Sequence, residues 1–99
     1  MSTSAYLTIT CTDNQVVAYL NGVQVYNRYG SGEFINQQVT LNLVNGSNQL
    51  LILGMNTGGP ARFQGSVTVD GVQENFDYNS NGNAQEGLIW QNFRTIQKG

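Results

Sequence analysis

Apolar and polar residues alternate with a period of two along several short segments of the chain. In residues 5–12, Leu7, Ile9 and Cys11 occupy every second position, and threonine or tyrosine stands between them. Residues 38–44 and 63–69 repeat this alternation. A period of two is typical of strands with one buried face, whereas no segment shows the 3.6-residue period of an amphipathic helix. The pattern therefore predicts a nearly all-β protein.

Turn residues separate these segments at short intervals. Asn21-Gly22 and Asp70-Gly71 each lie between two β-rich arms, and such pairs accept the positive φ angles of tight hairpins. Further turn signals occur near positions 13, 30, 46, 58 and 81. Together they predict about eight antiparallel strands in a single domain over residues 1–99. Two packed sheets, an antiparallel β-sandwich of jelly-roll type, would accommodate eight strands with such short connections.

Two segments depart from simple alternation. Residues 50–53 are four consecutive aliphatic residues, which favours a central strand covered on both sides. Residues 72–78 alternate again, but Glu74 falls on their apolar side. A carboxylate at that position indicates an edge strand or a bulge.

The composition limits the classes of function. The net charge is −2, and no basic run is available to neutralise a series of phosphates, so nucleic acid is not an expected partner. One cysteine and no histidine leave neither an internal disulfide nor a zinc or Cys/His catalytic site. The chain has no apolar stretch of membrane-spanning length and no signal-peptide pattern at its start. We therefore expect a protein that is cytoplasmic or released without a signal peptide.

Neutral polar residues replace the charges. The chain has 13 Asn and 10 Gln, and a further 14 residues are Ser or Thr. Amides donate and accept hydrogen bonds in pairs, as sugar hydroxyls require, and aromatic faces cover the C–H patches of a sugar ring. The composition is thus compatible with carbohydrate recognition, although Asn and Gly also serve the turns themselves.

A family resemblance points the same way. The stretches DNQVVAYLNGVQVYN (13–27) and NGSNQLLILGMNTGGPARFQGSVTVDG (45–71) contain an Asp-Asn segment before a YLNGV hairpin, a turn leading into an aliphatic strand, and an NTGGPA loop. In this order the elements resemble galactose-binding-domain-like jelly rolls, which occur as carbohydrate-binding modules and in some lectins. The resemblance implies a jelly-roll fold; members of the family bind sugars, bind calcium or support a neighbouring enzyme. The chain begins almost at its first strand, whereas family members are usually longer there.

Three loops, at residues 29–34, 56–62 and 79–87, are expected to form a shallow sugar site if they meet at one rim. The candidate ligand contacts are Tyr29, Asn56, Arg62, Asp77, Tyr78 and Asn79. Arg62 has the alternative of pairing with a nearby carboxylate. Trp90, the single tryptophan, stands in the apolar run 88–90 and is better explained by core packing.

The carboxylates do not predict catalysis. Asp13 and Asp70 stand at turns, and the pattern places no facing acid–base pair of the kind that glycosidases use. The chain is therefore expected to be no enzyme and to need no cofactor. Calcium remains an alternative through Asp77, Asn79 and Asn81, whose oxygen donors stand at alternate positions.

The neutral strand faces predict self-association. Few lysines protect strand edges, and the polar positions of three segments are expected to face outward: Thr8, Thr10, Thr12, Gln38, Thr40, Asn42, Gln64, Ser66 and Thr68. The leading hypothesis is a carbohydrate-binding, lectin-like protein without catalytic activity, multivalent as a homo-oligomer. The alternative is a structural or assembly protein that uses the same scaffold for protein–protein contacts.

Overall fold

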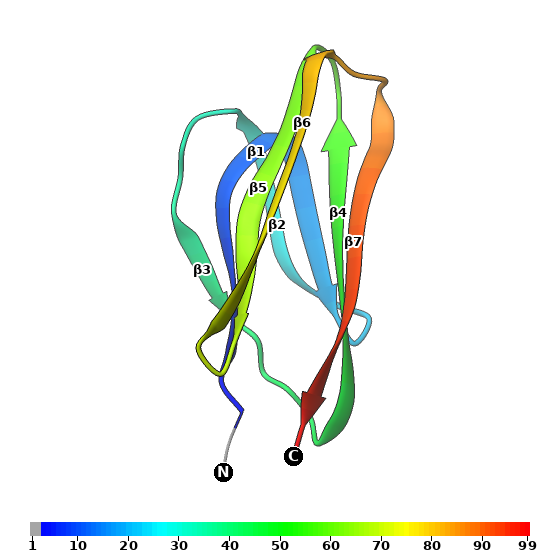
Figure 1. Cartoon of the computed structure of the whole chain (residues 1–99). Helices are drawn as coiled ribbons and strands as arrows, with labels where there is room; N and C mark the ends of the chain where they lie inside the picture. The colour runs from blue at the N-terminus through cyan, green and yellow to red at the C-terminus, as the bar shows by residue number, and fades with distance from the viewer. Residues whose placement is uncertain (1–2) are drawn as a thin grey trace.

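The computed structural model describes residues 3–99. Within this range the chain forms one antiparallel sheet of strands and contains no helix (Figure 1). The strands are β1 (Ala5–Leu20), β2 (Val23–Ser31), β3 (Gln37–Thr40), β4 (Gly46–Asn56), β5 (Pro60–Val69), β6 (Val72–Asn83) and β7 (Gly87–Lys98). The all-β, antiparallel prediction is confirmed, with seven described strands instead of about eight. The jelly-roll sandwich stays a prediction.

Strand β1 belongs to both halves of the sheet. Its first half pairs with β3 and β5, and its second half pairs with β2 and β4. The predicted turn near position 13 is wrong, because the strand runs on through Asp13 and Asn14. Both residues keep ladder partners in β2, Ser31 and Gly30 respectively. The backbone pairing of this long strand therefore replaces the turn that the Asp-Asn dipeptide favours.

A bulge in β1 reverses which side chains point inward. The register against β5 shifts between Ile9 and Cys11, so that the inward side changes by one residue. Cys11 is buried, as expected, but outside the core cluster that holds Leu7 and Ile9. Thr12, predicted to face outward, is only 1% exposed and lies opposite the buried Phe63. The prediction for Thr12 was wrong because a bulge cannot be read from alternation alone.

Both predicted hairpin turns are confirmed. Asn21 and Gly22 have φ angles of 51° and 81°, and Asp70 and Gly71 have 49° and 80°. Pairs of residues with positive φ match the right-handed twist of the strands that they connect. The two turns join β1 to β2 and β5 to β6.

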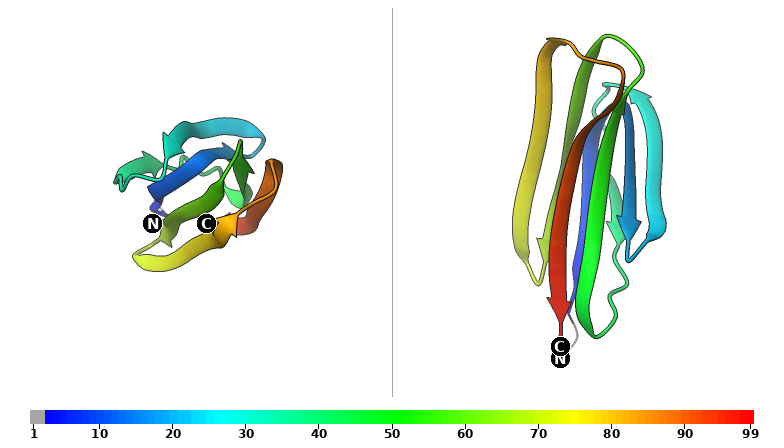
Figure 2. Two further views of the ribbon diagram at one scale, coloured as in Figure 1. Left: turned by 90° about the horizontal axis from the view of Figure 1, so that it is seen from above. Right: turned by 90° about the vertical axis from the view of Figure 1, so that its right-hand side faces the viewer.

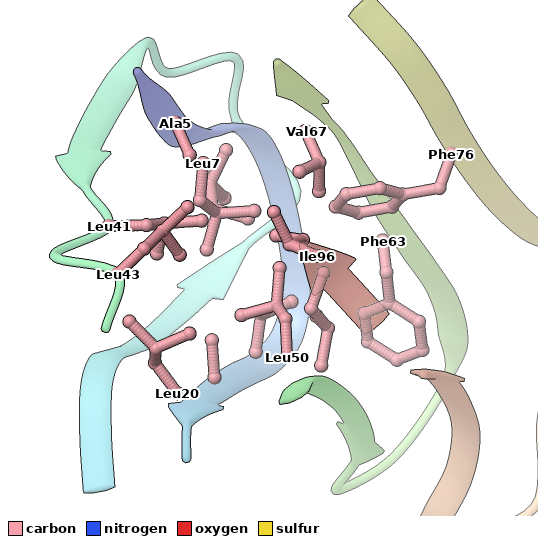
Figure 3. Packing of buried hydrophobic residues seen from close by; sticks show 14 of the residues in the cluster. Ala5, Leu7, Leu20, Leu41, Leu43, Leu50, Phe63, Val67, Phe76 and Ile96 are labelled. Carbon is pink, nitrogen blue, oxygen red and sulfur yellow. The ribbon is translucent and has the colours of Figure 1, made fainter. Parts of the chain in front are cut away.

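The sheet is curled, as the view from above in Figure 2 shows, and its inner side carries one hydrophobic cluster, drawn in close-up in Figure 3. The cluster draws residues from five of the strands and from the segment after β3, among them Leu7, Val16, Leu50, Phe63 and Phe76. Gly54 makes room for the Phe63 ring, since a Cβ at position 54 would stand 2.5 Å from ring carbons. Interiors are packed densely enough that such glycines fix the positions of the rings.

The two ends of the curled sheet meet through side chains. Strands β6 and β7 stand at opposite ends of the strand order, and the rings of Phe76 and Trp90 approach to 5.3 Å between centroids. Glu74 of β6 pairs with Arg94 of β7 at 3.1 Å. The prediction that Glu74 marks an edge strand is confirmed, and Trp90 packs against the core as expected. The inward carboxylate is explained by its partner on the facing strand.

Strand β4 has two different faces. It lies between β1 and β7, as the central placement predicts. Leu50 and Ile52 are fully buried in the core, whereas Leu51 and Leu53 on the other side are only half-buried. The expectation of cover on both sides therefore fails on the outer side. Among residues 3–99 there is also no helix with the length and hydropathy that a membrane crossing requires.

Candidate functional site

A groove of about 610 Å³ runs over the outer side of β6, β5, the first half of β1 and the segment around β3. The register brings the outward residues of these strands side by side, for example Thr8 of β1 opposite Ser66 of β5 and Gln38 of β3. Hydroxyls and amides predominate among the lining residues, which are Tyr6, Thr8, Thr10, Phe34, Gln38, Gln64, Gly65, Ser66, Gln73, Asn75 and Asp77. We call this feature the outer groove.

Small side chains on two central strands account for the hollow. Ser66, predicted to be an outward surface residue, is on the outer side but only 7% exposed, and its neighbour Thr68 is 4% exposed. Larger residues flank them, since Asn75 of β6 stands opposite Ser66, and Tyr6 of β1 stands opposite Thr68. The expectation of solvent exposure was wrong for Ser66 and Thr68 because longer neighbours cover a short side chain on a sheet.

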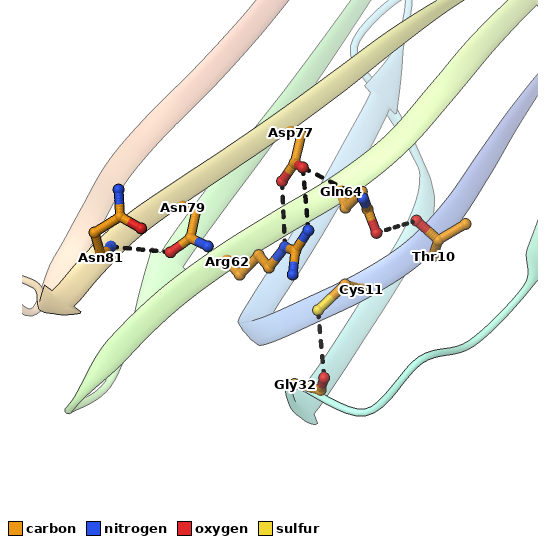
Figure 4. A network of polar contacts seen from close by, with 8 residues as sticks. All are labelled: Thr10, Cys11, Gly32, Arg62, Gln64, Asp77, Asn79 and Asn81. Carbon is orange, nitrogen blue, oxygen red and sulfur yellow. Dashed lines mark hydrogen bonds and ion pairs between the residues drawn. The ribbon is translucent and has the colours of Figure 1, made fainter.

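A hydrogen-bonded chain of four residues ends in the groove (Figure 4). Arg62 donates to both oxygens of Asp77, from Nε at 3.3 Å and from Nη2 at 3.1 Å. Gln64 donates to Oδ2 of Asp77 at 3.3 Å, and its own Oε1 accepts from Thr10 at 3.1 Å. The hydrogen bonds and charge of Asp77 raise the pKa of Arg62. The network fixes the amide of Gln64 and the carboxylate of Asp77, as a preorganised binding surface requires.

The three segments predicted as loops meet at one end of the molecule, although residues 29–31, 60–62 and 79–83 of these segments belong to strands β2, β5 and β6. Tyr29 and Thr57 share a hydrogen bond of 2.8 Å between their hydroxyls, which links the first loop to the second. The backbone N–H of Ala84 donates to the carbonyl of Gly59 at 3.0 Å, which links the third loop to the second. Tyr29 is 59% exposed at this end. A shared rim therefore exists, and ligand binding there stays a prediction.

Asn56 has a structural task at this rim. Its side chain is 1% exposed, and its amide donates to the carbonyls of Gly59, Ala84 and Gln85. Its Oδ1 accepts from the N–H of Gly58. With donors and acceptor engaged inside the protein, Asn56 is out of reach of a ligand, in contrast to its predicted role.

The remaining predicted contacts divide between the two sides of β6. Asp77 and Asn79 stand on the outer side, opposite Gln64 and Arg62 of β5. Tyr78 stands on the inner side, where its ring stacks on Phe63 at 5.7 Å. The period of two makes this division unavoidable for three consecutive residues in a strand. Tyr78 therefore belongs to the packing of the core and not to a surface shared with Asp77.

Two of the three predicted calcium donors, Asp77 and Asn79, are engaged within the protein. Asp77 is held by Arg62 and Gln64, and Oδ1 of Asn79 accepts from the N–H of Asn81 at 2.9 Å. Among residues 3–99, no three His, Cys, Asp or Glu side chains lie close enough together to hold a metal ion. Calcium stays an alternative that a titration has to decide.

Most residues that line the outer groove stand on strands and not in the segments predicted as loops. Tyr6, Phe34, Gln73 and Asn75 were not among the predicted contacts, although they contribute to the lining. The outward positions Thr8, Thr10, Gln38, Gln64 and Ser66 were recognised as a neutral surface. Their common signal was the run of amides and hydroxyls on the polar side of each alternating segment.

Comparisons of the chain with protein-family models, with curated proteins and with solved structures found no match. The resemblance to galactose-binding-like domains therefore stays a prediction.

Proposed function

We propose that this protein binds neutral carbohydrate in the outer groove and does not transform it. The observation that carries the proposal is the lining: fixed amides and hydroxyls share one hollow with the aromatic rings of Tyr6 and Phe34. Amides form paired hydrogen bonds with adjacent sugar hydroxyls, and an aromatic face packs against ring C–H groups. The groove supplies both kinds of contact.

The charges around the groove favour a neutral ligand. Within the part of the chain that the structure describes, Asp77 is the one carboxylate that lines the groove. The guanidinium of Arg62 pairs with it. No Lys or Arg belongs to this lining to attract an anion. Hydrolysis of a glycosidic bond would require a second carboxylate facing the first across the ligand. These features support binding without catalysis, in the manner of a small lectin.

The two-layered character of the jelly roll is part of the same proposal. The division of β1 supports it, because the first half pairs with β3 and β5 while the second half pairs with β2 and β4. Two sheets that share one strand would have this pairing. The outer groove would then occupy the outside of one layer.

Calorimetric titration with a panel of neutral monosaccharides and hexose oligosaccharides, with and without calcium, tests the proposal. The groove variant Gln38→Ala/Asn75→Ala removes two exposed amides, and each lost hydrogen bond contributes about 1 kcal/mol. We expect its affinity to fall at least tenfold. The matched control Gln24→Ala/Gln91→Ala removes two exposed amides outside the groove and should bind as the natural chain does. Failure of the natural chain to bind any sugar of the panel would refute the proposal.

A second candidate is the use of the scaffold for protein–protein contacts. Exposed apolar residues on the outer side of the half of the sheet that lacks the groove favour it, for example Phe93, which is 59% exposed. Size measurements distinguish it from carbohydrate binding, because an assembly protein forms large open complexes in the absence of sugar. A closed small oligomer that binds sugar supports the first candidate.

A further inference from the structure

The strands of the other half of the sheet carry an apolar surface on their outer side. The register places Val17 of β1 opposite Leu53 of β4, and Tyr19 opposite Leu51. Leu51 in turn stands opposite Phe93 of β7. We define the apolar outer face as Val17, Tyr19, Leu51, Leu53, Met55 and Phe93, which form adjacent rows across β1, β4 and β7.

These residues do not serve the core. The alternate positions Val16, Ala18, Leu50 and Ile52 belong to the core cluster, which includes none of the apolar outer face. Val17 is only 5% exposed, whereas Tyr19, Leu51, Leu53 and Met55 are half-buried and Phe93 is 59% exposed. No element formed by residues 3–99 covers this side of β4. Contiguous apolar surface of this kind marks an interaction site more often than ordinary solvent-exposed sheet.

The surroundings of the face are suited to a second copy of the same chain. Its neighbours along the strands are neutral amides and hydroxyls, including Gln15, Gln24, Gln49, Gln91 and Thr95. An amide carries both donors and an acceptor, so an amide rim can pair with an identical rim. A charged rim would instead repel its own copy. An apolar centre within a polar rim is also the usual anatomy of a protein interface.

The apolar outer face and its amide rim together have the size of a small interface. They extend over β2, β1, β4 and β7 and over the seven residues from Gln49 to Met55 along β4. Strands about 4.8 Å apart and residues about 3.3 Å apart give a rectangle of roughly 20 by 23 Å, or about 450 Å² before side-chain relief. Interfaces at the low end of the size range bury less than about 600 Å² on each partner. A membrane surface fits the face less well, because its six residues and amide rim include no Lys or Arg to meet anionic lipid.

We propose that two copies of this chain associate through their apolar outer faces, related by a twofold axis. In such a pairing Leu51 and Leu53 gain on their outer side the cover that the chain itself does not provide. The outer groove lies over the other half of the sheet and remains open in both copies. A consequence that rests on the proposed function is a pair of grooves able to link two carbohydrate chains.

Sedimentation equilibrium over a range of protein concentrations tests the pairing. We expect the natural chain to approach twice its 10.8 kDa mass. Phe93→Glu places a charge on the apolar outer face of both copies and should raise the dissociation constant at least tenfold. Phe34→Glu is the matched control, because Phe34 is also an exposed aromatic residue, 76% accessible, but lines the groove. This control should dimerise as the natural chain does.

A milder substitution keeps the test valid if Phe93→Glu fails to fold. Gln91→Glu changes only the charge of an exposed side chain beside Leu53 and should also weaken the dimer while the far-ultraviolet spectrum stays unchanged. A natural chain that stays monomeric at all concentrations would overturn the proposal. Equal weakening by Phe93→Glu and Phe34→Glu would overturn it too, as would flotation of the natural chain as a monomer with phosphatidylcholine vesicles. A natural chain that dimerises but binds no sugar would refute the proposed function alone.

Discussion

The two halves of the sheet present different residues on their outer sides, although strand β1 contributes to both halves. Along the first half of β1 the outward residues are Tyr6, Thr8 and Thr10, which stand beside the amides and hydroxyls of β5 and β3. Along the second half they include Val17 and Tyr19, which stand beside the leucines of β4. The inner sides of both halves enter the same core. Function in this fold therefore depends on what each strand presents to the outside.

The comparison also explains a limit of period-two patterns. Alternation tells which residues share a side, but it does not tell whether an outward side meets solvent, ligand or another chain. Leu51 and Leu53 illustrate this, since the aliphatic run 50–53 required cover on two sides and the chain supplies it on one. Substitutions on the inner sides of the two halves should therefore have similar effects, whereas substitutions on the two outer sides should have different ones.

A methyl group added on the inner side should destabilise the protein to a similar extent in either half of the sheet. Gly54 and Gly65 lie in different halves, and each lies against a phenylalanine ring. A Cβ at position 65 would meet the backbone carbonyl oxygen of Thr8 and would stand 2.8 Å from the ring of Phe76. We expect Gly54→Ala and Gly65→Ala each to lower the free energy of unfolding by about 3 kcal/mol, because overpacking forces rings or backbone to shift. Urea unfolding measures this, with Ser47→Ala on the exposed start of β4 as control. A loss below about 0.5 kcal/mol would contradict the equivalence.

Removing an unpartnered hydroxyl should stabilise the protein. Within residues 3–99 the buried Oγ1 atoms of Thr12 and Thr68 have no hydrogen-bond partner. Valine has nearly the same shape, so Thr12→Val should raise the free energy of unfolding by about 1 kcal/mol, and Thr68→Val by somewhat less. Thr10→Val is the contrasting variant, since its hydroxyl donates to Gln64, and it should lower stability. If Thr12→Val lowered it as much as Thr10→Val, the inward placement of Thr12 would be in doubt.

The ion pair beside the groove should contribute little to stability. The side chains of Arg62 and Asp77 are 37% and 45% exposed, so solvent and salt screen their attraction. Asp77→Asn should lower the free energy of unfolding by no more than about 0.5 kcal/mol in chemical denaturation. The loss should shrink further at high salt. A loss above 2 kcal/mol would show that this network supports the fold and does more than shape the groove.

Two carboxylates at the loop rim should have opposite effects on stability as the pH changes. Hydrogen bonds from the N–H groups of Glu33 and Ser31 and from Arg28 lower the pKa of Glu33, so its stabilising contribution is present above its unfolded pKa and lost as the pH falls. Burial and the charge of Glu33 raise the pKa of Asp13, so its ionised form opposes folding at neutral pH.

Thermal unfolding from acid to neutral pH tests this difference in sign. At pH 7, Asp13→Asn should raise the melting temperature slightly, and Glu33→Gln should lower it. Both differences should fade as the pH falls through the pKa values of the two carboxyls and the native groups become protonated. Shifts of the same sign for both variants at pH 7 would contradict the prediction.

Much of the fold could be predicted from local signals. Positive-φ pairs such as Asn21-Gly22 and Asp70-Gly71 define their hairpins by themselves. Glu74 indicated an edge strand, because a carboxylate on the apolar side of a strand needs a partner or solvent. The features that the sequence did not predict depend on pairing between strands that are far apart along the chain. The bulge after Ile9 turns the side chain of Thr12 to the inner side of the sheet. Asp13, where a turn was expected, lies in a strand because β2 and β5 pair with it from both sides.

The sequence predicted the chemical character of the candidate site better than its position in the fold. The abundance of amides indicated a neutral polar surface, and Asp77 is one of the lining residues. Asn56 and Tyr78 were assigned to a ligand because loop asparagines and tyrosines commonly contact sugars. Asn56 is buried by contacts with segments far along the chain, such as Ala84, and Tyr78 is half-buried by its stacking on Phe63. Such contacts leave no mark in the local sequence.

The sharing of β1 has a consequence for how the protein loses its structure. The two halves are joined by backbone hydrogen bonds only through this strand in the described strand order, since β5 and β6 lie on one side of it and β4 and β7 on the other. Neither half retains a complete sheet once β1 is withdrawn. We therefore expect melting as a single cooperative transition, and expect amides at the centre of β1 to exchange with deuterium last.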